Sequence, residues 1–154
     1  MSAKNRDLPD DVRSIIGSAD CAGPAREIVV KELESALGYP LPAQYRAFLL
    51  AFGAALFHGF EIYGLPSQSD NEPPAWSDIR DALRTVSMQG FSGRLIPISD
   101  DGGDFSFFVA VNEGASDSSP VVAYGPGCDG REVAASFFDF IRAASKSGVA
   151  SILR

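Results

Sequence analysis

The sequence is poor in the residues that most often carry catalysis, metal binding or cross-linking. In 154 residues it has one histidine, His58, and two cysteines, Cys21 and Cys128, which lie far apart and form no CxxC pair. Secreted disulfide scaffolds need several closely spaced cysteines. This cysteine usage is instead typical of a reduced cytosolic protein.

Long apolar runs and a signal peptide are also missing. No stretch approaches the roughly 20 consecutive apolar residues that span a bilayer, and the opening segment MSAKNRDLPDDVRSIIG lacks the apolar core of a signal peptide. Apolar residues still make up 45% of the chain, with eleven phenylalanines, which is enough for the interior of one domain at this length. We expect a cytoplasmic single-domain protein without a membrane partner.

Basic residues are scarce in the middle of the chain. Between Glu61 and Asp129 there are eleven acidic and three basic residues, whereas the rest of the chain has nine acidic and ten basic residues. Direct binding of nucleic acid is disfavoured, because cationic side chains that displace counterions from phosphates supply much of that affinity. The negative field of such an acidic segment attracts a basic partner, although acidic surfaces also serve solubility alone.

The first half of the chain predicts two packed helices. Apolar residues recur at helical spacing in REIVVKELESALG (26–38), which ends in a glycine suited to stop the helix. In the following segment, Pro42 suits the first position of a helix, and Gly53 suits its end. One broad apolar stripe connects these two positions.

The ends of the chain carry weaker patterns. Residues 1–25 have few periodic apolar positions, although Val12, Ile15 and Ile16 suit a single helical turn, so we expect a flexible or loosely docked leader there. The folded domain is expected over residues 26–146. Residues 147–154 are expected to form a short tail.

The second half of the chain alternates apolar runs with turn residues, as sheets do. The predicted strands are GFEIYGL (59–65), RLIPI (94–98), FSFFVAV (105–111) and VVAY (121–124). Pro97 indicates a sheet edge or a bulge, and FSFFVAV is apolar on both faces, which favours a central strand. Helices are predicted for WSDIRDALRTV (76–86) and REVAASFFDFIRAAS (131–145). This order predicts an α+β domain, with a mainly antiparallel sheet flanked by N-terminal helices and a C-terminal helix.

Three aspartates and two glycines lie together in SDDGGD (99–104), between two predicted strands. A calcium loop that began at Asp100 would need an oxygen ligand at its third position, a glycine at its sixth and a glutamate at its twelfth. The chain has Gly102, Phe105 and Val111 there, and no histidine or cysteine is nearby for a transition metal. Aspartate and glycine favour tight turns, so the pattern predicts an acidic hairpin turn without a metal.

Catalytic patterns are equally weak elsewhere. His58 lies in FHGF, and a lone histidine between aromatic residues is more often structural than a general base. The chain has no G-x-S-x-G elbow, no phosphate loop and no G-x-G-x-x-G after a strand. We therefore expect no enzymatic activity and no cofactor, with a small hydrolase that uses His58 and nearby carboxylates as the less favoured alternative.

The order of these elements resembles the SUKH superfamily, which includes the fungal cell-wall regulators of the Smi/Knr type. The resemblance begins in ELESALGYPLPAQYRAFLLAFG, where the matching positions are Glu34, Leu37, Gly38, Leu41, Pro42, Tyr45, Phe48, Leu49 and Gly53. Phe52 stands where the family usually has asparagine. Later blocks match in order at GFEIYGL, IPISDDGGDFSFFV and SFFDFI, so that the resemblance covers roughly residues 27–144.

The resemblance implies a function in protein binding. Many bacterial members of that superfamily are thought to be immunity proteins that neutralise a toxin, often a nuclease or deaminase, and the superfamily shares no catalytic residues. We therefore expect an immunity protein that binds a basic toxin through its acidic surface, as a monomer or weak homodimer. A regulatory scaffold of the cell-wall regulator type is the alternative. The candidate partner-binding residues are Asp100, Asp101, Asp104, Glu113 and Asp117.

Overall fold

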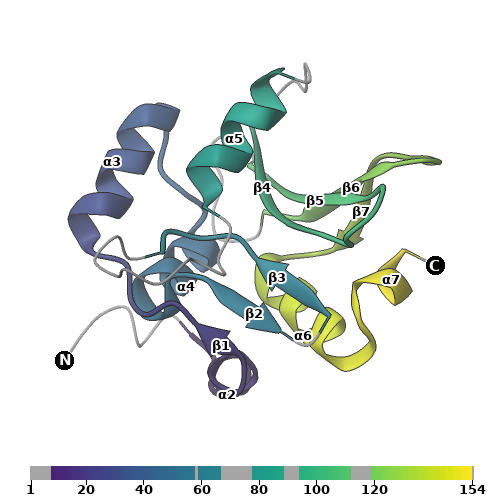
Figure 1. The fold of residues 1–154 in the computed structure, drawn as a ribbon, viewed down its shortest axis with the longest axis horizontal. Coiled ribbons are helices and arrows are strands. Elements are labelled where there is room, and N and C mark those ends of the chain that lie inside the picture. The colour runs from purple at the N-terminus through teal and green to yellow at the C-terminus, as the bar shows by residue number, and fades with distance from the viewer. Residues whose placement is uncertain (1–7, 58, 67–77, 89–93, 112–118, 154) are drawn as a thin grey trace.

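Two antiparallel sheets and the helices around them make up the fold (Figure 1). The computed structural model describes residues 8–57, 59–66, 78–88, 94–111 and 119–153. In this part of the chain the predicted α+β class is confirmed.

The two helices predicted in the first half are present. Helix α3 (Glu27–Leu37) ends at Gly38, whose positive φ of 84° lets its N–H bond the Glu34 carbonyl. Helix α4 (Ala43–Phe52) follows Pro42 directly and ends at Gly53, as its apolar stripe predicts. The corner between the two helices is therefore fixed by local sequence signals.

The segment before these helices belongs to the folded domain. Helix α2 (Asp10–Gly17) buries Val12 and Ile16 completely, and strand β1 (Asp20–Cys21) pairs with strand β2 (Ala55–Phe57). This corrects the expectation of a loosely docked leader for residues 8–25. A helix of two turns needs only one narrow apolar stripe to dock on the core, so the few apolar residues of this segment are sufficient.

The strands predicted in the second half are also present. Strand β3 (Phe60–Ile62) completes the first sheet, in the order β1-β2-β3. The second sheet has the order β4-β5-β6-β7, formed by Leu95–Asp100, Ser106–Ala110, Val121–Gly125 and Cys128–Ala134. Pro97 lies on the outermost strand β4, where the register shifts, and β5 is central, both as predicted. The Tyr63 N–H donates to the Ile98 carbonyl at 2.8 Å and links the two sheets.

The helix predicted over residues 131–145 is wrong in its first part. Residues Cys128–Ala134 form β7, which pairs with β6 across a two-residue turn at Pro126 and Gly127. Proline followed by a glycine with φ of 77° is a sequence suited to such a turn. Helix α6 (Phe137–Ser147) begins only after Ser136, whose hydroxyl accepts from the Asp139 N–H at 3.2 Å.

Helices cover both faces of the second sheet (Figure 1). On one face, Phe140 of α6 packs against Phe107 of β5, with ring centroids 5.2 Å apart. Phe137 continues this packing to Tyr45 of α4, at 5.3 Å. Helix α5 (Ile79–Met88) lies by β4 on the opposite side, and the short α7 (Val149–Ile152) follows α6. The parts considered for function are the end of the second sheet and the hollows beside the helices.

Candidate functional site

The aspartate turn connects β4 and β5, as the sequence predicts. Asp100 Oδ1 accepts from the Gly102 N–H at 2.7 Å, and Asp101 Oδ1 accepts from the N–H groups of Gly103 at 2.8 Å and Phe105 at 3.1 Å. Gly102 has a φ of 79°, which glycine adopts without strain. Two of the three carboxylates therefore hold the turn itself.

The second oxygen of Asp100 also has a structural partner. The Tyr63 hydroxyl donates to Asp100 Oδ2 and ties the turn to the first sheet. Burial, together with this carboxylate, raises the pKa of Tyr63 well above its ordinary value. Tyr63 is thus held as a neutral hydrogen-bond donor, which does not suit it to act as a base at neutral pH.

The predicted partner-binding residues lie on both sides of β5 in the sequence. Asp100, Asp101 and Asp104 precede β5, whereas Glu113 and Asp117 lie outside the described residues. Asp104 is exposed, and its carboxylate has no hydrogen-bond or ion-pair partner in the described part of the chain. Of the three described candidates, Asp104 is the exposed one, and its carboxylate does not take part in holding the turn.

One further acidic residue, Asp129, lies at the same end of the sheet. It pairs in register with Tyr124 just past the β6–β7 turn, and it is exposed. Gly125 of that hairpin lies against the aspartate turn, so closely that a Cβ added to it would be 2.8 Å from the Asp104 carbonyl oxygen. The sequence signal was present in YGPGCD, where Pro-Gly indicates a hairpin. We call Asp100, Asp101, Asp104 and Asp129 the acidic end of the sheet.

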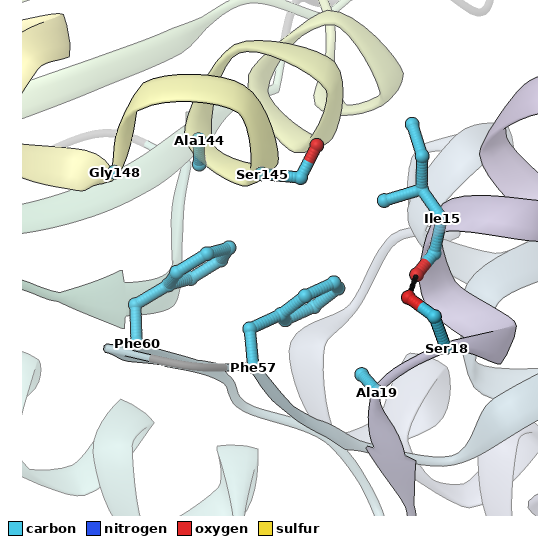
Figure 2. Close-up of a pocket in the computed structure, with 8 residues that line it drawn as sticks. All are labelled: Ile15, Ser18, Ala19, Phe57, Phe60, Ala144, Ser145 and Gly148. Atoms are coloured by element: carbon cyan, nitrogen blue, oxygen red, sulfur yellow. Dashed lines mark hydrogen bonds between the residues drawn. The ribbon is translucent and has the colours of Figure 1, made fainter.

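A hollow of about 260 Å³ lies between α2, the β2–β3 hairpin and α6 (Figure 2). Its floor is formed by Phe57 and Phe60, whose rings stack with centroids 4.6 Å apart and planes 1° apart. We call it the aromatic hollow, and its lining residues are Ile15, Ser18, Ala19, Phe57, Phe60, Ala144, Ser145 and Gly148. It is smaller than the roughly 300–1,000 Å³ of most small-molecule sites.

A second cleft, of about 190 Å³, lies between α5 and the β4–β5 hairpin, where Tyr63 and Phe108 line it. Two of the hydroxyl groups in this cleft form hydrogen bonds within the protein. Ser99 donates to the Glu61 carbonyl at 2.7 Å, and Thr85 donates to the Asp81 carbonyl at 3.3 Å. Neither of these two hydroxyls is paired with a general base, as an activated nucleophile would be.

Other reactive groups of the described residues do not form a catalytic or metal-binding cluster. Burial raises the pKa of the Cys21 thiol, whose hydrogen bonds go to backbone carbonyls, and this makes it a poor nucleophile. Among the residues that the structure describes, no three histidine, cysteine, aspartate or glutamate side chains gather where they could hold a metal. His58 lies outside the described residues, so the hydrolase alternative stays a prediction.

The polar residues of the α3–α4 segment have structural partners. Glu34 Oε2 accepts from the Leu41 N–H at 2.8 Å and pairs with Arg46 Nε at 3.3 Å, which fixes the corner between the helices. The fully buried Tyr45 donates its hydroxyl to the Tyr63 carbonyl at 2.6 Å, and burial raises the pKa of Tyr45 far above its ordinary value. These positions maintain the fold.

The described chain is thus a small α+β domain whose buried polar groups serve its own turns and corners. The SUKH_5 family, described as SMI1-KNR4 cell-wall, matches residues 12–146, and the chain belongs to this family. The resemblance predicted from the sequence is confirmed. Family membership supports a protein-binding or immunity-type role in general.

A solved structure shows the same fold. It is described as a crystal structure of a protein from Pseudomonas syringae pv. tomato, with a TM-score of 0.69 at 17% sequence identity, and the match covers 90% of this chain and 100% of that one. No curated protein matches the sequence. Within the described residues, none of the helices has both the length and the apolar character needed to cross a membrane.

Proposed function

We propose that this chain is a non-enzymatic immunity-type protein that binds and neutralises a basic toxin at the acidic end of the sheet. The observation that carries the proposal is the pair of exposed aspartates, Asp104 and Asp129, on two adjacent hairpins. Neither carboxylate has a hydrogen-bond or ion-pair partner among the described residues. Both are open to cations of a partner.

The hairpins hold these carboxylates in place. Asp100 and Asp101 fix the aspartate turn through its own N–H groups, and Gly125 lies against that turn. Loops that are already fixed in the free protein lose less conformational entropy when a partner binds. Complementary charge also raises the association rate and suppresses wrong partners, which favours fast capture of a toxin.

The class of toxin follows from the sign of the charge. The segment from Glu61 to Asp129 has eleven acidic residues against three basic ones. Enzymes that cleave or deaminate nucleic acids need cationic surfaces to bind phosphates, so a nuclease or a deaminase offers the complementary surface. The second candidate, a regulatory scaffold, would bind a protein of the cell's own regulatory machinery and needs no such complementarity.

The test is a pull-down from source-cell lysate with the purified protein as bait, eluted with rising salt. Three variants accompany the wild type: Asp104→Asn and Asp129→Asn at the acidic end, and Glu32→Gln as the control. Glu32→Gln also removes one exposed carboxylate, but on α3. We expect capture of a basic nuclease or deaminase that the bait inhibits, with earlier elution from both aspartate variants and unchanged elution from the control.

Three other outcomes would count against the proposal. Capture of cellular regulatory proteins alone favours the scaffold function. Capture of a toxin with the same salt profile from all four baits places its interface away from the acidic end. Hydrolysis of a chromogenic ester or phosphodiester by the purified wild type, lost in His58→Ala, would support the hydrolase alternative instead.

A further inference from the structure

The aromatic hollow lies where two helices end. Helix α2 ends at Gly17, and α6 ends at Ser147. The hollow is lined by Ser18 and Ala19 just past the first end and by Gly148 just past the second (Figure 2). The C-terminal end of a helix carries a partial negative charge from its aligned peptide dipoles and favours a cation. The end of α2 therefore favours a cation at the hollow, whereas at Gly148 the start of the short helix α7 (Val149–Ile152) opposes the partial charge of the α6 end.

The floor of the hollow also favours a cation. The rings of Phe57 and Phe60 are parallel and stacked, and they line the hollow below the last turn of α6 (Figure 2). Phe60 is 7% exposed, whereas Phe57 is half-buried and offers more of its surface. The face of an aromatic ring carries negative electrostatic potential, and guanidinium groups stack on it preferentially.

The charged side chains near the hollow differ in whether they already form ion pairs. Asp20 is exposed and directly follows Ala19, which lines the hollow, so this segment carries a negative charge. Arg142 is already paired, at 2.7 Å with Asp11 and at 2.9 Å with Asp139. Lys146 lies on the last turn of α6, where it partly offsets the helix dipole, but it does not line the hollow. Within the described residues of α6, repulsion of a bound cation therefore comes mainly from the exposed Lys146.

We infer that the aromatic hollow receives an arginine side chain of the partner protein. At about 260 Å³ it is smaller than most small-molecule sites, which favours one side chain over a whole ligand. Its chemistry combines an apolar floor for the arginine stem, aromatic rings for the guanidinium, and the C-terminal end of α2 with the nearby Asp20 for the charge. The inference rests on the proposed function, since it supplies a second contact for the same basic partner.

The test uses a small probe and needs no toxin. Amide NMR spectra of the full chain are recorded during titration with N-acetyl-arginine amide, and in parallel with N-acetyl-leucine amide. We expect saturable shifts of Ala19, Ser145 and Gly148 with the arginine probe at roughly millimolar concentration. Leucine amide is expected to cause weaker shifts, because it lacks the charge.

Three variants test the electrostatic reasoning. Phe57→Leu keeps an apolar floor and removes a ring face, so the arginine probe should bind about two- to fivefold more weakly. Asp20→Asn should weaken binding, and Lys146→Ala should strengthen it, although neither residue lines the hollow. The opposite signs of these two changes distinguish a cation site from an apolar groove.

The inference is overturned if leucine amide binds as well as arginine amide, if the arginine shifts map only to the acidic end, or if no shifts occur. It is also overturned if both charge variants leave the affinity unchanged. Such results leave the proposed function standing, because toxin capture is judged separately by Asp104→Asn and Asp129→Asn. Conversely, if the arginine probe binds in the hollow but no toxin is captured, the proposed function is contradicted and the cation site is not.

Discussion

Replacing Asp101 with alanine separates the structural aspartates of the turn from those available for binding. Asp101 Oδ1 accepts two backbone N–H groups, from Gly103 at 2.8 Å and from Phe105 at 3.1 Å. Asp104 lies three residues away, is exposed, and makes no such bond within the described chain. Asp101→Ala should therefore destabilise the domain, whereas Asp104→Ala should leave its stability nearly unchanged.

The size of the effect follows from these two hydrogen bonds. A buried hydrogen bond to a charged group contributes about 1.5–3 kcal/mol, and a neutral one about 1 kcal/mol. Gly103 is exposed, so water replaces the lost acceptor there and the lower figures apply. We expect a loss of about 1–2 kcal/mol for Asp101→Ala, and less than about 0.5 kcal/mol for Asp104→Ala. In a chain of this length, the larger loss lowers Tm by roughly 2–8 °C.

Urea unfolding followed by circular dichroism measures both changes. Asp101→Asn is the matched control, because its side-chain oxygen can still accept the same N–H groups, and it should recover most of the lost stability. The reasoning is refuted if Asp101→Ala unfolds at the same urea concentration as Asp104→Ala. It is equally refuted if Asp101→Asn is as unstable as the alanine variant, since charge alone would then explain the effect.

Four further predictions concern the core and its ion pairs. Tyr45→Phe leaves the Tyr63 carbonyl without its hydroxyl donor and should cost about 1–3 kcal/mol in denaturant unfolding. Because burial raises the pKa of Tyr45 above the ordinary value of 10.0, its contribution is complete below pH 10 and is lost at higher pH; in the same assay Tyr45→Phe should flatten the alkaline loss by about 1.4 kcal/mol per pH unit. Gly125→Ala forces a Cβ to 2.8 Å from a backbone oxygen of the aspartate turn and should cost about 1–3 kcal/mol in urea unfolding. The Arg142 guanidinium lowers the pKa of Asp11 below 3.8, so Arg142→Ala should lower Tm at neutral pH, and the difference should shrink as the pH falls below that value.

Three results would contradict these predictions. Equal stability of Tyr45→Phe and wild type would mean that the buried hydroxyl contributes nothing. Parallel alkaline profiles would mean that Tyr45 ionises as freely in the folded state as in the unfolded state. A Tm difference for Arg142→Ala that persists undiminished in acid would show that the arginine acts through packing and not through the Asp11 carboxylate.

Patterns confined to a few neighbouring residues predicted the fold well. Helix α3 follows from apolar periodicity that ends at Gly38, helix α4 follows from apolar periodicity between Pro42 and Gly53, and both helices are present. Pro97 indicated an edge or a bulge, and β4 has both. The SDDGGD turn was predictable because aspartate bonds the backbone within a few residues of itself.

Features that depend on distant residues were not predictable in this way. Val133 matches the helical period of α6, yet it belongs to β7, because pairing with β6 satisfies its backbone. Asp129 joins Asp104 at one end of the sheet only through the packing of two hairpins. The aromatic hollow likewise combines α2, β2, β3 and α6, which are brought together only by the tertiary fold.

The central claim is that a basic toxin binds the acidic end of the sheet. Its most direct test is calorimetric titration of the captured toxin with wild type, with Asp104→Asn/Asp129→Asn, and with Glu32→Gln, each at low and raised salt. We expect the double variant to bind the toxin at least tenfold more weakly than the wild type at low salt. Raised salt should reduce this difference in affinity. Glu32→Gln should bind with the same affinity as the wild type. Equal affinity of the double variant and the wild type at both salt concentrations would contradict it.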